Sequence, residues 1–388
     1  MRILVAPNSL KESLSANEVG DQILQGLKLF SLTHPHVSIE TRFQPICDGG
    51  TGFTDILTKT LNGKQVTVES YDPKYRPINT TYGTVGTNTA IIEVAKVAGL
   101  ALLKKDERNP LYTSSYGVGD LLLKAWQSGA RNFYIGCGDT AINDYGIGML
   151  SALGVRFFDK SGKVIENPVA KDIPNIASQD LSNSLCQQFK ESCTVTVACN
   201  LTSMLKGSLA SSRVYAIQKG ASAEEAEMLE GCADIFLHLA DPRNDIFLGH
   251  LPGAGGAGGL AGALRAYLGA ELKYSFEVVF ECINFNQYLK WADLVITSEG
   301  LFDENSAKGK APVAVALFAK RYNCETALLA GSVERKSLSK MHRSGLDWIE
   351  PFSSDLVDLS HYIEDAALLA EEATIRLMTK ITQQGREQ

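Results

Sequence analysis

The chain of 388 residues lacks the patterns that identify several large classes of protein. Its eight cysteines include no C-x-x-C pair, which disfavours a zinc site and favours buried, reduced thiols in a cytoplasmic protein. No dense run of lysine and arginine occurs and the formal net charge is -7, so we expect neither nucleic acid nor an anionic membrane as a partner. No stretch approaches the roughly 18 apolar residues of a transmembrane helix, and the N-terminal apolar run is too short for a signal peptide.

Two motifs of nucleophilic and phosphate chemistry are also missing. No G-x-S-x-G sequence occurs and the six histidines are scattered, so a serine hydrolase is not expected. The stretch 251–264, LPGAGGAGGLAGAL, lacks the lysine and hydroxyl that end a Walker A loop, and it is not a G-x-G-x-x-G turn after a strand. Its six glycines indicate only that the backbone closely approaches something, either a ligand or another backbone segment.

The chain does contain apolar, strand-like runs that alternate with helical patterns. Hydrophobic residues make up 45% and charged residues 21%, which is ordinary for a globular protein of two or three domains. We expect strands at 2–6, 37–43, 90–95, 131–138, 193–199, 292–300 and 325–333, and helices at 15–30, 115–129, 311–323 and 364–384. Strands separated by helices predict an α/β fold with largely parallel sheets.

Five segments share one design, in which an apolar strand leads into a polar, glycine-containing turn and then a helix. They are 6–16, 47–53, 108–125, 136–150 and 297–312. In open α/β sheets, ligands bind beyond the carboxyl ends of the strands, where such turns gather. These five turns are therefore the candidate site.

The first four turns each have a functional and a structural interpretation. Lys11 is either a cation for a phosphate or carboxylate, or a solvated lysine. Asp48 precedes two glycines. In the functional interpretation it holds Mg²⁺ or accepts a hydroxyl proton, and in the structural interpretation it caps a tight turn. Ser114 and Ser115 precede a helix, where their hydroxyls either bind an oxyanion or cap the N-terminus of the helix. Asp144 lies in a glycine-flanked turn, and hydrogen bonding within that turn is the structural alternative.

The fifth turn favours a functional role. Glu299, Asp303, Lys308 and Lys310 follow an apolar strand. Two carboxylates and two lysines within a dozen residues can bind Mg²⁺ and phosphate oxygens, and a solvated loop is the alternative. Together the turns predict a phosphate-handling site with many backbone donors, few lysines and several carboxylates for a metal.

Nine motifs, in order, make the chain similar to the type I glycerate kinase family, the bacterial glycerate 2-kinases, over essentially its whole length. They are APNSLKESLSA, DGGTG, ERNPLYTSSYG, NDYGIGML, QKGA, PGAGGAGGL, ADLVITSEG followed by aspartate, GKAPVAVA and LAGSV. The resemblance implies two α/β domains with a cleft between them, one of them Rossmann-like with a mostly parallel sheet. It implies that residues 1–70 and 287–388 form the Rossmann-like domain and that 71–286 form the second.

The resemblance also implies an activity: transfer of the γ-phosphoryl group of ATP, with Mg²⁺, to a hydroxyl of D-glycerate. The family indicates the C2 hydroxyl and hence 2-phosphoglycerate, while 3-phosphoglycerate stays open. For such a reaction we assign roles by chemical type. We expect the nucleotide to bind Gly253, Gly255, Gly256 and Gly258 of the 252–259 loop, with Ser114, Ser115 and Lys310, and Mg²⁺ to bind Asp303 and Glu299. The expected catalytic residues are Asp48, which would orient the attacking hydroxyl, with Asp144 as the second candidate, and Lys11 and Asn200.

This chain departs from the family pattern inside several of these motifs. Thr51 stands where the family has glutamate, Asp139 where it has glycine, Asn200 where it has aspartate and Leu301 where it has arginine. Two alternatives therefore stay open: a catalytically weakened relative that binds a nucleotide or hydroxy acid as a sensor, and a kinase of another small hydroxy acid. The sequence does not distinguish a monomer from a homodimer.

Overall fold

The computed structural model describes residues 1–10, 13–303, 306, 310–334, 344–353 and 365–384. The chain divides into two compact units, the first formed by Met1–Asp48 and Val279–Gln388 and the second by Gly49–Val278. The resemblance implies boundaries at 70 and 287, and that division stays a prediction. In the structure, β3 (Lys64–Tyr71) pairs with β4 (Pro77–Val85) and α2 (Phe53–Thr60) packs on the same sheet, so these elements belong to the second unit.

The first unit contains a five-stranded sheet in which every neighbouring pair is parallel. Its strands are β1 (Arg2–Val5), β2 (Glu40–Phe43), β11 (Leu294–Phe302), β12 (Glu325–Val333) and β13 (Trp348–Pro351). Its helices are α1 (Ala16–Thr33), α11 (Phe285–Trp291), α12 (Ala311–Lys320) and α14 (Ala366–Gln384), and α10 (Ser275–Cys282) crosses the boundary between the units. The order β13-β12-β11-β1-β2 reverses direction between β1 and β11, which is the position where doubly wound sheets bind ligands.

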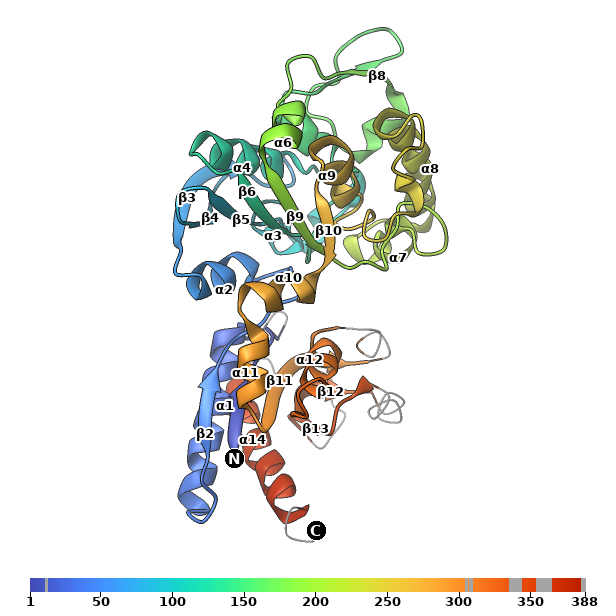
Figure 1. The fold of residues 1–388 in the computed structure, drawn as a ribbon. Helices are drawn as coiled ribbons and strands as arrows, with labels where there is room; N and C mark the ends of the chain where they lie inside the picture. The colour runs from blue at the N-terminus through green and yellow to red at the C-terminus, as the bar shows by residue number, and fades with distance from the viewer. Residues whose placement is uncertain (11–12, 304–305, 307–309, 335–343, 354–364, 385–388) are drawn as a thin grey trace. The chain divides into compact units, whose positions relative to one another are not determined.

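Alternate residues of the central strands cover opposite faces of this sheet. Ala327 and Leu329 of β12 belong to a cluster with α1 and α14, whereas Leu328 and Ala330 pack with α12. Helices α1 and α14 lie side by side along one face (Figure 1). The strands are buried on both faces, which is why they appear in the sequence as continuous apolar runs.

The second unit contains a mixed six-stranded sheet of order β10-β9-β6-β5-β4-β3. Strands β5 (Thr89–Glu93), β6 (Asn132–Gly136), β9 (Thr194–Cys199) and β10 (Glu271–Tyr274) are parallel, and β3 and β4 are antiparallel. A separate pair is formed by β7 (Arg156–Asp159) and β8 (Ile176–Asp180). The α-helices are α2, α3 (Ala95–Ala98), α4 (Tyr116–Gln127), α5 (Ile147–Ala152), α6 (Cys186–Ser192), α7 (Ser211–Tyr215), α8 (Ala223–Ala240) and α9 (Leu260–Leu268). The short 3₁₀ helices are Leu100–Leu102, Lys105–Glu107, Pro110–Tyr112, Ala170–Asn175, Ile217–Lys219 and Leu248–His250.

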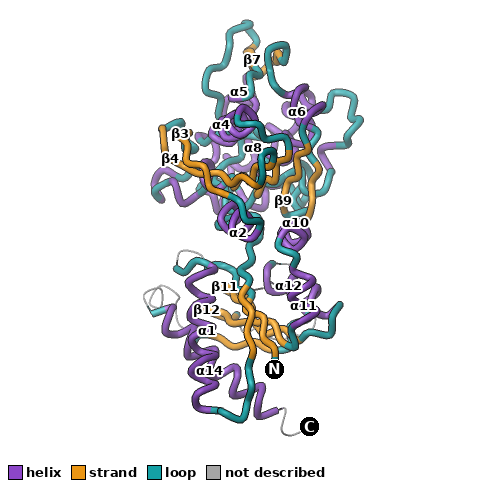
Figure 2. The backbone as a smooth tube through the Cα atoms, turned by 60° about the vertical axis from the view of Figure 1, so that its left-hand side comes forward, coloured by secondary structure: helices purple, strands orange, loops and turns teal. Residues whose placement is uncertain are grey.

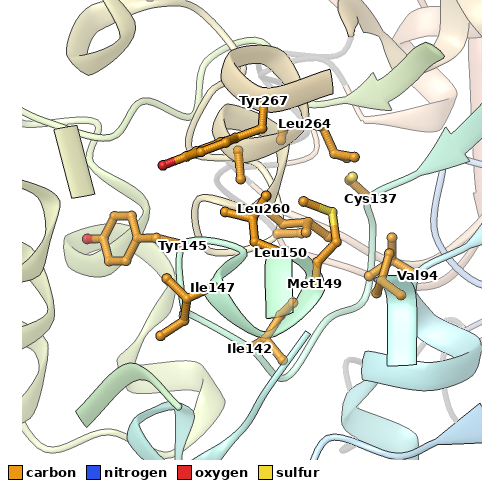
Figure 3. Packing of buried hydrophobic residues seen from close by; sticks show 14 of the residues in the cluster. Val94, Cys137, Ile142, Tyr145, Ile147, Met149, Leu150, Leu260, Leu264 and Tyr267 are labelled. Atoms are coloured by element: carbon orange, nitrogen blue, oxygen red, sulfur yellow. The ribbon is translucent and has the colours of Figure 1, made fainter. Parts of the chain in front are cut away.

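The core of the second unit joins the 142–150 segment to the start of α9. Figure 3 shows the side chains of this cluster, with Ile142, Tyr145, Ile147, Met149 and Leu150 beside Leu260 and Leu264. Ala90 and Ile92 of β5 face the same cluster, so Ile91 points to the other face. Figure 2 shows α2 on the opposite face of the sheet from α4. The glycine-rich loop before α9 is therefore anchored in the largest apolar core of the unit.

Most elements expected from the sequence are present close to their predicted bounds. The expected capping box forms at α1, where the Glu18 N–H donates to the Ser15 hydroxyl at 3.3 Å and the Ser15 N–H donates to the Glu18 carboxylate at 2.8 Å. The eight cysteines all lie in the described part of the chain, where none of them forms a disulfide and six are buried. In the part of the chain that the structure describes, no helix combines the length and apolar character needed to cross a membrane.

Candidate active site

The first unit brings Lys310, Glu299 and Asp303 together at the carboxyl end of β11. The Lys310 Nζ atom lies 3.3 Å from Glu299 Oε1 and 3.5 Å from Asp303 Oδ1. Lys310 is the N-cap residue of α12, so the start of this helix positions its ammonium group. One cation is thus held between two carboxylates at the edge where parallel sheets bind ligands.

Ser306 holds the carboxylate of Asp303 in place. Its N–H donates to Asp303 Oδ1 at 2.7 Å, and its hydroxyl lies 3.0 Å from the same oxygen. Burial acts to raise the pKa of Asp303, but the Ser306 hydrogen bonds and the Lys310 charge together outweigh it and lower that pKa. Asp303 is therefore ionised at neutral pH.

Glu299 differs from Asp303 in being buried, with one oxygen unsatisfied. The residue is 8% exposed, and its Oε2 atom has no hydrogen-bond partner among the described residues. Burial, with a smaller contribution from the charge of Asp48, raises the pKa of Glu299 to about 7 against the opposing influence of Lys310 and Ser306. This glutamate consequently changes its charge close to physiological pH, and Asp48 lies near enough to influence it.

The same edge includes the point at which the strand order reverses. The Ser298 hydroxyl of β11 donates to the Asn8 carbonyl oxygen at 2.7 Å, which joins β11 to the segment after β1. Lys11 and Lys308, two of the predicted cations, lie outside the described residues. Of the predicted residues that the structure describes in this unit, Asp48, Glu299, Asp303 and Lys310 gather at this edge.

These side chains suit a Mg²⁺ ion that takes only one or two of its ligands from the protein. Among the described residues, no group of three or more His, Cys, Asp or Glu side chains could hold a metal ion by itself. Mg²⁺ at phosphoryl-transfer sites is usually bound by one or two carboxylates, with water and substrate phosphate completing the shell. The unsatisfied Oε2 of Glu299 and the ionised Asp303 meet that smaller requirement.

In the second unit, Asp144 is a fully buried acceptor of hydrogen bonds. Its Oδ2 atom accepts from the Ser115 N–H at 2.7 Å, the Ser115 hydroxyl at 2.8 Å and the Gly148 N–H at 3.2 Å. Its Oδ1 atom accepts from the Gly146 N–H at 3.1 Å. Burial raises the pKa of Asp144, and these hydrogen bonds oppose that effect. The acceptor at the N-terminus of α4 is thus the protein's own Asp144 side chain.

The two serines predicted to bind phosphate are both occupied within the protein. The Ser115 hydroxyl also accepts the Met149 N–H at 2.8 Å. The Ser114 hydroxyl donates to the Tyr75 hydroxyl at 2.9 Å. Ser114 and Ser115 are fully buried, so in this conformation they fasten the start of α4 to neighbouring segments.

The glycine-rich loop is packed mainly against protein. An added Cβ at Gly255 would lie 2.2 Å from the Met204 carbonyl oxygen, and one at Gly258 would lie 2.3 Å from the Ile142 carbonyl oxygen. The Gly253 and Gly255 N–H groups both donate to the Ser203 carbonyl, at 2.9 and 3.2 Å, and the Gly256 N–H donates within the loop. The close approach that the glycines predict is therefore to backbone, and three of the four glycines predicted to bind nucleotide have their N–H groups engaged.

Comparison with known proteins identifies the chain at the level of a family. The model of the glycerate kinase family matches residues 3–382. The chain belongs to the glycerate kinase family. Members of this family are ATP-dependent phosphotransferases.

Relatives of the same family match almost end to end. A glycerate kinase of Bacillus subtilis is 36% identical over 370 residues, covering 95% of this chain and 94% of that protein. The glycerate 2-kinase of Escherichia coli is 36% identical over 348 residues, covering 89% of each. A solved structure from Salmonella typhimurium LT2, provisionally named glycerate kinase 2, covers 100% of both chains with a TM-score of 0.78 and 33% identity. The two-unit α/β fold is thus that of the glycerate kinase family.

Two of the departures from the glycerate kinase pattern contact each other. The Thr51 N–H and hydroxyl both donate to Asp139 Oδ2 at 3.0 Å. Asp139 adopts a φ of 54°, in the left-handed region. A carboxylate therefore lies next to position 51, although residue 51 itself is not acidic.

Asn200 lies exposed just after β9, where its Oδ1 atom accepts the Thr202 N–H at 3.0 Å and the Thr202 hydroxyl at 2.9 Å. An aspartate could accept the same two hydrogen bonds, so the turn does not require the amide. Its predicted catalytic role stays a prediction.

Sequence reasoning missed two buried ionisable residues in the second unit. Lys219 is 7% exposed and donates to the Ile142 carbonyl at 2.7 Å and to the Thr140 hydroxyl at 3.3 Å. Glu93, at the end of β5, is 3% exposed and accepts the Thr54 N–H at 3.2 Å. The QKGA motif contains Lys219 and could have drawn attention to it, whereas Glu93 lies inside an apolar strand without any motif.

Proposed function

We propose that this protein transfers the γ-phosphoryl group of ATP to the C2 hydroxyl of D-glycerate and so produces 2-phosphoglycerate. The observation that carries the proposal is the match to glycerate kinases over nearly the whole chain, one of them named a glycerate 2-kinase. Transfer to the C3 hydroxyl, which yields 3-phosphoglycerate, is the alternative within the same reaction class.

The edge of the parallel sheet in the first unit is the proposed position of the nucleotide phosphates. Lys310 would neutralise a phosphate oxygen once it exchanges Glu299 or Asp303 for the ligand. Phosphoryl transfer depends mainly on positioning and charge neutralisation, which such a cation supplies. Leu301 is 40% exposed near this edge and contributes no charge, so Lys310 would be the principal cation among the described residues there.

Glu299 and Asp303 are the proposed ligands of Mg²⁺. The ion, when bound, would neutralise charge on the transferring phosphoryl oxygens. Asp48 is the proposed residue that orients the acceptor hydroxyl and takes its proton, because its carboxylate lies near enough to Glu299 to influence the pKa of that side chain.

The product of the reaction decides between the alternatives. The protein is incubated with MgATP and D-glycerate and followed by ³¹P NMR, which separates 2-phosphoglycerate from 3-phosphoglycerate. The proposal expects the 2-phosphate at a rate of order 1–100 s⁻¹, the range of ordinary kinases. Turnover only with a different hydroxy acid would identify another acceptor, and ATP binding without any phosphorylated acid would identify a sensor.

A further inference from the structure

Five buried side-chain atoms around the glycine-rich loop of the second unit have no hydrogen-bond partner among the described residues. They are Asn143 Nδ2, Asn143 Oδ1, Ser203 Oγ, Ser211 Oγ and Ser212 Oγ. The four residues are at most 4% exposed. Native proteins satisfy nearly all buried polar groups, because each unsatisfied one destabilises the folded state. Their concentration in one region therefore calls for an explanation.

Close contacts place Ser203 and Ser211 on one side of the loop. The Cβ position of Gly255 lies 2.6 Å from Ser203 Oγ and 2.2 Å from the Met204 carbonyl oxygen. The Ser211 N–H, at the start of α7, donates to that same carbonyl at 2.9 Å. The Ser203 hydroxyl thus lies directly against Gly255, and the Ser211 backbone is bonded to the carbonyl that Gly255 approaches.

Asn143 and Ser212 lie together near the other end of the loop. The Cβ position of Gly258 is 2.4 Å from the Asn143 Cα atom. Asn143 and Ser212 both adjoin the Tyr145 side chain and act to lower its pKa, although burial raises that pKa overall. Asn143 and Ser212 do not form a hydrogen bond with each other. The Tyr145 hydroxyl donates to the Leu229 carbonyl oxygen at 2.7 Å.

The loop adds two backbone donors at the same place. The Ala257 and Gly258 N–H groups have no acceptor among the residues that the structure describes. Ala257 adopts a φ of 51°, which is uncommon for a residue with a side chain. The unsatisfied donors and the unusual backbone therefore coincide between Gly255 and Gly258.

A buried cation lies beside this layer. The Lys219 Nζ atom donates to the carbonyl oxygen of Ile142, the residue before Asn143, at 2.7 Å. Burial lowers the pKa of Lys219 to about 8, against the opposing influence of Asp144, so the ammonium form still predominates at pH 7. Lys219 is therefore the cation that lies against the backbone of this layer.

We propose that Asn143, Ser203, Ser211 and Ser212, with the Ala257 and Gly258 amides, bind the small hydroxy acid that accepts the phosphoryl group. This inference rests on the proposed kinase function and assigns its acceptor site to the second unit. The unsatisfied atoms are closed to solvent in this conformation, so binding of the acid requires a rearrangement of the glycine-rich loop.

The chemistry of the site favours a hydroxy acid over a nucleotide phosphate. An amide and three hydroxyls can both donate and accept, as the hydroxyls of an acid such as glycerate require. The backbone amides suit a single carboxylate. A triphosphate carries several negative charges, whereas Lys219 is the single cation identified beside these groups among the described residues, and its ammonium group already donates to Ile142 and Thr140.

Alanine variants at Ser203 and Ser211 test the proposal. Because each removes an unsatisfied buried hydroxyl, we expect Ser203→Ala and Ser211→Ala to keep or raise the Tm. We expect each to raise the KM for D-glycerate at least tenfold, with the KM for ATP changed less than twofold. Ser70→Ala is the matched control, since Ser70 is 2% exposed and its hydroxyl already donates to the Gly117 carbonyl at 3.4 Å. That control should lower the Tm and leave both KM values unchanged.

A raised Tm with unchanged KM for D-glycerate in both variants would overturn the proposal, as would a selective loss of ATP affinity. A thermal-shift panel keeps the test independent of turnover, with D-glycerate, D-lactate and inorganic phosphate as probes for the wild type and for Ser211→Ala. Stabilisation of the wild type by D-glycerate or D-lactate that is lost in Ser211→Ala supports the site even if glycerate is not phosphorylated. Stabilisation by phosphate alone, or by none of the three, contradicts it.

Discussion

The Nζ atom of Lys310 lies 3.3 Å from Glu299 Oε1, while Oε2 of the same carboxylate is buried without a hydrogen-bond partner among the described residues. A buried carboxylate that is only half satisfied is poised to exchange its partner for a ligand. This pair lies where the strand order of the parallel sheet reverses, and it connects the fold of the first unit to the proposed nucleotide chemistry.

Replacing Lys310 with methionine should reduce kcat/KM for MgATP about 100-fold, because a transition-state cation is lost while the aliphatic stem is kept. Steady-state kinetics with D-glycerate at saturation measure this change. Lys28→Met is the control, since Lys28 is exposed on α1 of the same unit. Equal rates for the Lys310 variant and the control would remove Lys310 from the site.

The apparent affinity for MgATP should depend on pH through Glu299, whose pKa burial raises to about 7. A metal ligand must be deprotonated, so the KM for MgATP should increase roughly tenfold for each pH unit below 7 and level off above about 8. The measurement is KM between pH 5.5 and 8.5 at constant free Mg²⁺. The Glu299→Gln variant should bind MgATP more weakly, and its KM for MgATP should no longer depend on pH. If its KM instead varied with pH as in the wild type, a group other than Glu299 would be titrating.

Asp144→Asn should destabilise the protein by about 3 kcal/mol, because an amide nitrogen would face donors that now point at a carboxylate. Four such hydrogen bonds from Ser115, Gly146 and Gly148 converge on this side chain. Urea unfolding measures the loss. A catalytic base would behave differently, since the variant would then keep its stability and lose kcat.

Gly255→Ala should destabilise the fold by about 2–3 kcal/mol, since the new methyl group would lie 2.2 Å from the Met204 carbonyl oxygen. Gly231→Ala is the matched control. Gly231 is exposed within α8 and has open space at its Cβ position, so this change should stabilise by about 1 kcal/mol. Thermal unfolding of both variants compares them, and a Gly255 variant as stable as the wild type would mean that the loop repacks easily.

Glu93 should make the protein less stable as the pH rises from about 4.5 to 7. Burial raises its pKa in the folded state from 4.5 to about 7, so the unfolded chain releases this proton first. The contribution is complete below pH 4.5 and is lost above 7, and it amounts to at most about 3 kcal/mol. Urea unfolding of the wild type and Glu93→Gln across this range should show a difference that grows with pH, and parallel curves would argue against the shift.

Local sequence patterns were sufficient for most of the first unit. The Ser15 and Glu18 spacing predicts the capping box that forms at α1, and the expected strand 325–333 coincides with β12. Glu299 and Lys310 could also be assigned to one site, because only eleven positions separate them across a single strand–helix turn. Contacts between residues this close in the sequence form within one short segment, and the conformation of such a segment is set largely by its own residues.

The second unit could not be predicted to the same depth. The glycines of 253–258 indicate a close approach, but only the fold shows that Met204 and Ile142 are what Gly255 and Gly258 approach. Asp144 and Ser115 looked available for a ligand, yet they satisfy each other across 29 positions of chain. Nothing in the spacing of polar residues distinguishes a group that faces a ligand from one that faces protein.

The sequence by itself determined the α/β class, most of the strands and helices of the first unit, and the family, because apolar periodicity, capping and ordered motifs are properties of contiguous residues. Only the tertiary structure decided which polar groups are buried, which are satisfied and what the glycine-rich loop packs against. Those properties depend on segments far apart in the chain, such as Asn143, Ser211 and Gly258, and burial energetics act only once the fold has brought them together.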